Sequence, residues 1–292
     1  MKFGSVARRT ALWAVGCAIA AGGCSSCVRG APRGGLITDA SRISAVLSQR
    51  ATRVRALRAH GSADIYNREG RKRGDLDIAV RAPDHIRFDI SAFGVSFFSL
   101  VSDGTRFGLL QGNQFIVGPA RACAAQRIAG IALEAREIAA VLSGGVPVIG
   151  APVGPVRWEE GRYVVDLRTN EGNTARIELE LPSDQDALPP DRQTPRVSRM
   201  VLRDLRGPRA DIRYESYRVV QGEAYPDRVR VLIPRDEVDM QVRFDRIEPG
   251  DPTPAAPDIN DPLAEDNPRP ASNDPFRVAP AQPTNEVIPV DC

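Results

Sequence analysis

The chain has 292 residues, of which 42% are hydrophobic and 26% are charged, and its formal net charge is +2. This composition is typical of a folded protein and excludes a fibrous or wholly disordered chain. Of its 39 basic residues only Lys2 and Lys72 are lysines. The arginines are scattered among acidic residues and form no basic cluster with interleaved aromatics, so we expect no nucleic-acid partner.

The first residues predict a secretory signal. Lys2, Arg8 and Arg9 precede an apolar run over 11–21, and small residues follow it. The run is too short for a permanent transmembrane helix, which needs roughly 20 residues. We therefore predict a cleaved signal peptide over 1–23. Arg8 and Arg9 also fit a twin-arginine signal, but the residues around them match that signal poorly.

The expected cleavage point is followed directly by Cys24. Small residues before a cysteine resemble the lipobox of bacterial lipoproteins, which implies cleavage after Gly23 and acylation of Cys24. Cys24 would then bind membrane lipid, and two or more acyl chains anchor a protein stably. The alternatives are Cys17 or Cys27 as the modified residue, or an ordinary secretion signal with an unmodified cysteine.

The cysteines that remain give no clear disulfide framework, because Cys27, Cys123 and Cys292 are an odd number. One pair is chemically possible in an oxidising envelope, and the sequence does not say which.

Residues 24–37 read as a tether, and 38–248 as one folded domain. Thr38 or Asp39 caps a predicted amphipathic helix that ends near Arg58 and has its apolar residues at helical spacing (Ile43, Val46, Leu47, Val54 and Leu57). From Ser62 onward, apolar and polar residues alternate, as in antiparallel strands with one dry face.

A helical break interrupts the alternating pattern. Residues 122–130 are rich in alanine. Ile138, Val141 and Leu142 of 134–143 follow Leu133 at helical spacing. About six strands precede this break and about five follow it, with Pro182–Pro195 as a loop. We therefore predict a mainly β fold: a single curved antiparallel sheet of about eleven strands, forming an open half-barrel with helices over the open side.

The end of the chain, 249–292, holds 11 prolines, 8 acidic residues and 2 arginines. Such a composition buries too little apolar area to offset the loss of chain entropy, so we predict a disordered tail.

The order of these elements resembles the LolA and LolB lipoprotein-localisation family over about residues 40–247. The resemblance rests on four stretches: GDLDIAVRAPDHIRFDISAFG (74–94), SLVSDGTRFGLLQGNQFIVG (99–118), IAAVLSGG (138–145) and the closing strands of 214–248. The family implies an open half-barrel whose apolar cavity holds the acyl chains of a client lipoprotein.

The resemblance also implies roles for particular residues. Phe93, Gly94 and Val95 match the family's protruding, membrane-inserting loop, within Ser91–Phe98. Candidates for the cavity wall are Ile78, Phe88, Ile90, Val165 and Leu179, and candidates for the lid helix are Ile138, Val141 and Leu142. The alternative for Phe93, Phe97 and Phe98 is that they pack in the core.

We accordingly expect a LolB-like, periplasm-facing protein of the outer membrane. Ser25 supports this location by analogy, because enteric bacteria retain lipoproteins at the inner membrane through an Asp at that position. It would act as a monomer, accepting acyl chains from a LolA-like carrier. The other hypothesis is a lipid-anchored scaffold that binds proteins and has a filled β core.

Motifs for catalysis are absent from the sequence. Neither His60 nor His85 is placed as a base, and no Gly-x-Ser-x-Gly elbow, P-loop or dinucleotide fingerprint occurs. Glu134 and Glu137 lie one turn apart, which favours a solvated helix face over a catalytic pair. Asp75 and Asp77 have no further ligands nearby for a metal. We expect no enzyme, cofactor or metal site.

Overall fold

The computed structural model describes residues 29–53, 56–68, 70–111, 114–120, 133–147, 150–169, 172–250 and 286–287. Several predictions lie outside these residues. They are the signal peptide, Cys24, Cys27, Cys123, Cys292, the helical piece over 122–130 and nearly all of the tail.

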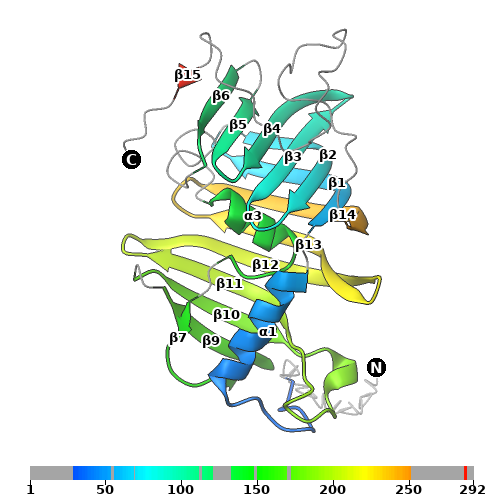
Figure 1. The fold of residues 1–292 in the computed structure, drawn as a ribbon, viewed down its shortest axis with the longest axis vertical. Coiled ribbons are helices and arrows are strands. Elements are labelled where there is room, and N and C mark those ends of the chain that lie inside the picture. Colours follow the sequence, from blue (N-terminus) through cyan, green and yellow to red (C-terminus); the bar gives the residue numbers. More distant parts are fainter. Residues whose placement is uncertain are drawn as a thin grey trace, which may run out of the picture.

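Within the described residues, one sheet of fifteen strands dominates the fold (Figure 1). The first half comprises α1 (Ala40–Arg53), β1 (Ala56–Asn67), β2 (Gly70–Arg81), β3 (His85–Ala92), β4 (Val95–Asp103), β5 (Arg106–Gln111) and β6 (Gln114–Pro119). Then follow α3 (Ala135–Leu142), β7 (Ala151–Pro152), β8 (Arg157–Glu159), β9 (Arg162–Arg168), β10 (Thr174–Glu180) and the 3-10 turn η1 (Ser183–Gln185). The last elements are β11 (Arg196–Asp204), β12 (Gly207–Val220), β13 (Glu223–Ile233), β14 (Val238–Pro249) and β15 (Glu286–Val287).

The sheet is continuous because its first strand pairs with the last long one. β1 lies between β2 and β14, so the strand order runs β15-β6-β5-β4-β3-β2-β1-β14-β13-β12-β11-β10-β9-β7. All described pairings are antiparallel except that of β15 with β6, and α1 and α3 lie over the same side of the sheet (Figure 1). The prediction of a mainly β, single antiparallel open sheet is confirmed. The strand number exceeds the expected eleven chiefly because β7, β8 and β15 are too short to leave an alternating pattern.

The alternating residues pack into one apolar cluster on the helix-covered side. It takes side chains from both helices and from strands in both halves of the sheet, including Ile43, Leu76, Val141, Ile177 and Phe244. Each fully buried large apolar side chain contributes roughly 1.5–3 kcal/mol, so this cluster is the main source of stability.

One predicted boundary was wrong. α1 ends at Arg53 rather than near Arg58, and Leu57 belongs to β1, where it is 2% exposed. Leu57 is paired with Pro249 of β14 and Val80 of β2. Pairing on both sides outweighs the helical spacing of the local sequence, as tertiary context commonly does.

The strand connections form two rims. We call "mouth rim" the side that carries the turns after β1, β3, β11 and β13, and "loop rim" the side that carries the connections after β2, β10 and β12. Because hairpins in an antiparallel sheet alternate sides, the turn after β3 and the loop after β10 lie on opposite rims.

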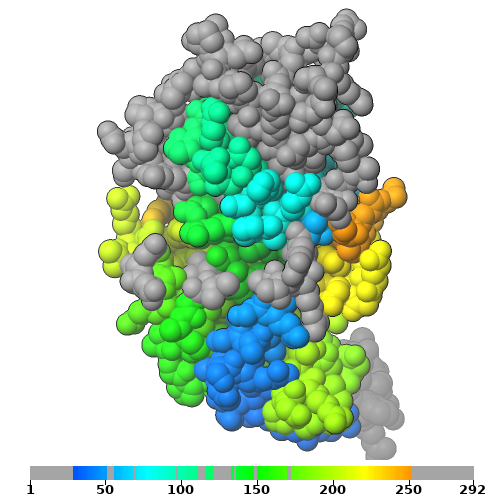
Figure 2. All heavy atoms as spheres, viewed as in Figure 1, coloured from blue at the N-terminus to red at the C-terminus, as the bar shows by residue number. Residues whose placement is uncertain are grey.

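The segment before α1, predicted as part of the tether, packs on the loop rim. Gly34 donates its backbone N–H to the Asp186 carbonyl at 2.9 Å, and Arg33 pairs with the Asp186 carboxylate at 2.8 Å. Ile37 is 3% exposed, and its N–H lies 3.3 Å from the Tyr163 hydroxyl. Figure 2 shows α1 and the loop after β10 side by side. This segment is therefore held against the folded domain.

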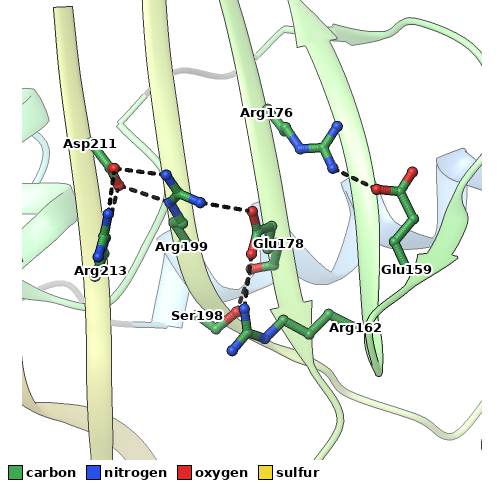
Figure 3. Close-up of polar contacts among 8 residues, drawn as sticks. All are labelled: Glu159, Arg162, Arg176, Glu178, Ser198, Arg199, Asp211 and Arg213. Carbon is green, nitrogen blue, oxygen red and sulfur yellow. Dashed lines mark hydrogen bonds and ion pairs between the residues drawn. The ribbon is translucent and has the colours of Figure 1, made fainter. Parts of the chain in front are cut away.

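The outer face of β9–β12 carries a ladder of ion pairs (Figure 3). Arg199 holds the Asp211 carboxylate with two hydrogen bonds of 3.0 and 2.8 Å and lies 3.5 Å from Glu178. Burial opposes ionisation of Asp211, but the hydrogen bonds from Arg199 and Arg213 hold its pKa below the usual value. Many scattered arginines thus neutralise carboxylates on neighbouring strands.

Candidate functional site

A cavity of about 110 Å³ lies between α3 and the inner face of the sheet. Strands from both sides of the β1–β14 junction contribute to it. Its sixteen lining residues are Ile65, Asn67, Lys72, Phe88, Phe98, Leu100, Leu133, Ile138, Val141, Leu142, Val229, Val231, Ile233, Val238, Met240 and Val242. Fourteen of them are apolar, so the hollow suits a hydrocarbon rather than a polar substrate.

The cavity opens toward the mouth rim. Val229 and Val242, in the middle of their strands, are each 1% exposed. Asn67, Lys72 and Val238 lie at strand ends on the mouth rim and are only partly buried. Exposure therefore increases from the centre of the sheet to this rim, which makes the rim the entrance.

The amino-terminal end of α3 is held by an acidic pair that sequence reasoning placed on a solvated face. Glu137 is buried, accepts the Glu134 backbone N–H at 2.8 Å and pairs with Arg209 of β12. The expected solvated face was wrong for Glu137. Burial raises the pKa of this carboxyl, although Arg209 favours its charged form.

Polar contacts also hold the carboxyl-terminal end of α3. Arg50 of α1 donates to the Gly144 carbonyl at 2.7 Å and to the Ser143 carbonyl at 3.3 Å, and it also reaches the Ala224 carbonyl. The Tyr214 hydroxyl lies 3.0 Å from the carbonyl oxygen of Gly145. Both ends of the helix are thus attached, and α3 stands as a fixed wall over the cavity.

The predicted cavity residues divide into two groups. The lining includes Phe88 of the predicted wall and Ile138, Val141 and Leu142 of the predicted lid. The other wall candidates, Ile78, Ile90, Val165 and Leu179, are buried in the apolar cluster and do not line this cavity.

The sequence reasoning did not single out Lys72, Met240 or Ile65 as lining residues. Alternation placed apolar residues of β13 and β14 on the dry face, but it carried no sign of which of them border a hollow. The one usable signal was Lys72, the sole lysine after the signal segment among so many arginines.

The predicted tip, Phe93, is fully exposed in the two-residue turn between β3 and β4, and Val95 is 67% exposed. Phe93 has a φ of 54° and Gly94 has a φ of 78°. This left-handed backbone favours glycine or asparagine and is costly for a bulky side chain. Two other X-Gly turns share this backbone, but they use the polar residues Glu160 and Gln221. Backbone strain combined with an exposed ring points to a functional role for Phe93.

The described part of the chain has neither a metal-binding cluster nor a membrane-spanning helix. These residues include no group of three or more His, Cys, Asp or Glu that could hold a metal ion. None of the described helices is long and apolar enough to cross a membrane.

The sequence matches no family model and no curated protein. Solved structures do match. A DUF1329 family protein from Desulfovibrio piger superposes with a TM-score of 0.51 and 10% identity, covering 72% of this chain and 92% of that chain. A LolA superfamily protein from Nitrosomonas europaea gives a TM-score of 0.45 and 11% identity, covering 74% and 96%.

A third structure, described as a putative outer membrane lipoprotein-sorting protein domain from Vibrio parahaemolyticus, gives a TM-score of 0.39 and 10% identity, covering 75% and 95%. At such identities the likeness concerns the fold alone. The chain shares the fold of the DUF1329 protein and has a more distant likeness in structure to the other two proteins.

Proposed function

We propose that this chain is a lipid-anchored envelope protein that accepts an acyl chain of a lipid or lipoprotein, as LolB does. The observation that carries the proposal is the apolar cavity between α3 and the sheet, which opens at one rim. Transfer of an apolar chain into such a hollow is favourable by about 0.8 kcal/mol per buried CH2. The protein would work by shape, with no reaction.

The size of the cavity limits what it holds. Its volume of about 110 Å³ is below that of an engineered apolar cavity of about 150 Å³ that binds benzene. It therefore accommodates the end of one acyl chain. Deeper entry requires α3 to move away from the sheet, and the contacts of Arg50 and Glu137 resist that movement.

The anchor and the tip constrain how the protein meets a membrane. Cys24 precedes Arg29 by five residues, which span at most about 18 Å. The segment after Arg29 packs on the loop rim, whereas Phe93 lies on the mouth rim. A single membrane leaflet contacts both the anchored segment and Phe93 only if the domain lies along the membrane surface. In this orientation the cavity entrance faces the lipid of the outer membrane or an incoming carrier.

The test is uptake of a fluorescent fatty acid by the full chain, together with mass spectrometry of copurified lipid. Wild type should show saturable uptake. Met240→Trp fills the cavity entrance and should abolish it, and Val219→Trp, on the exposed part of β12, should leave it unchanged.

Thermal unfolding of both variants shows whether the fold is retained. If Met240→Trp does not fold, Val238→Phe blocks the same entrance. Wild type without copurified lipid or uptake would refute the proposal and favour a protein-binding scaffold.

A further inference from the structure

The polar groups of the cavity are gathered at one place. Asn67 and Lys72 are the two polar residues among the sixteen that line it, and both belong to the β1–β2 hairpin at the mouth rim. An apolar hollow with a cation at its entrance matches an amphiphile that has an apolar chain and a charged head.

The strand register places Lys72 on the inner face. Lys72 pairs directly with Ile65, another lining residue, so the two share one face of the sheet. Its neighbours Arg71 and Arg73 point to the opposite face, where Asp64 lies 2.8 Å from Arg71 and 3.8 Å from Arg73. The inward position of this one basic residue therefore follows from the alternation of β2.

The chemistry of lysine suits this position. A lysine covers apolar surface with its methylene stem and keeps its ammonium in water. Lys72 is partly buried, so such a side chain contributes to the wall and presents its charge where the cavity opens. An ammonium attracts an anion more strongly beside low-dielectric walls than in open water.

We propose that Lys72 is a specificity-determining residue that makes the cavity select amphiphiles with an anionic head group. The end of the acyl chain enters the cavity, and a carboxylate or phosphate remains at the mouth rim beside Lys72. This inference rests on the proposed function and specifies the ligand class of the same site.

The experiment compares two ligands that share a ten-carbon acyl chain, decanoate and the neutral 1-monodecanoylglycerol. Isothermal titration calorimetry measures the binding of each ligand to the full chain. Wild type should bind decanoate about tenfold more tightly, which corresponds to about 1.4 kcal/mol. Lys72→Met should remove this difference by weakening decanoate alone, and Lys72→Arg should keep it.

Arg73→Met is the matched control, because it removes a positive charge from the outer face of the same strand. It should leave both affinities unchanged. The preference for decanoate should also shrink as salt rises from 50 to 500 mM, as screening predicts. Decyl phosphate tests the other anionic head group. If wild type prefers it over the neutral ligand as strongly as it prefers decanoate, the site selects anions in general.

Distinct outcomes would overturn the two proposals. Equal binding of both ligands by wild type, or an equal loss of both in Lys72→Met, would refute head-group selection and leave acyl-chain binding intact. Failure of wild type to bind either ligand would refute the acyl-binding function and this inference with it.

Discussion

Replacing Phe93 by asparagine should stabilise the fold while removing membrane contact. Phe93 is fully exposed, so its removal forfeits no buried apolar area. Its φ of 54° costs a bulky residue of order 1 kcal/mol, and asparagine tolerates this conformation. We expect Phe93→Asn to raise the free energy of unfolding by about 0.5–1 kcal/mol, or Tm by about 1–4 °C for a domain of this size.

The same substitution should weaken binding to lipid. Full insertion of a phenylalanine side chain into an apolar phase contributes about 1.5–3 kcal/mol, which is roughly ten- to hundredfold in partitioning. Flotation of the chain with phosphatidylglycerol vesicles measures this loss. The chain should carry Cys24→Ser, so that its own anchor does not mask the effect of the tip.

Gln221→Asn is the control, since Gln221 occupies a similar turn with a φ of 51° on the loop rim. It should produce the same gain in stability and no change in vesicle binding. The reasoning would be refuted if Phe93→Asn lowered stability by more than about 1 kcal/mol, because the ring would then be packed. Unchanged flotation of Phe93→Asn would refute membrane insertion.

Three further substitutions test the anchor, the helix and the ion pairs. Cys24→Ser should move the chain from the membrane fraction to the soluble fraction of the envelope. Arg50→Met removes the hydrogen bonds to the carbonyls after α3 and should lower the free energy of unfolding by about 2 kcal/mol in urea titrations, whereas no change would mean that α3 is held by packing alone. Asp204 has its pKa lowered to about 2, chiefly by the hydrogen bond from Arg235. A carboxyl with a lowered pKa stabilises the fold above its ordinary pKa of 3.8, and this stability is lost as the pH falls toward 2. Asp204→Asn should therefore cost about 1 kcal/mol at pH 7 and nothing below about pH 2, and a cost that persists in acid would contradict the ion-pair explanation.

Local patterns predicted most of the sheet correctly. The alternation in Ile86, Phe88 and Ile90 identified β3, because a strand with one dry face repeats every two residues. The helical spacing of Ile138, Val141 and Leu142 identified α3 in the same way. For Phe93 the sequence left two alternatives open, an exposed tip and a ring packed in the core, and the structure has the ring exposed.

The alternating pattern could not show which parts of the interior are filled with side chains and which are hollow. Val165 and Phe88 have the same alternating signature, yet Val165 packs in the solid part of the core and Phe88 borders the cavity. The difference depends on which residues face each one across the fold, and those residues lie far away in the sequence.

The periodicity of the side chains was enough to establish an open antiparallel sheet with helices on one side, because it reports which face of each element is dry. The hollow, its entrance and the inward lysine required the assembled fold. β1 joins β14 across most of the chain, and this long-range pairing brings Lys72 and Met240 to one entrance. No local preference encodes such a meeting, since it results from the register of strands that are distant in sequence.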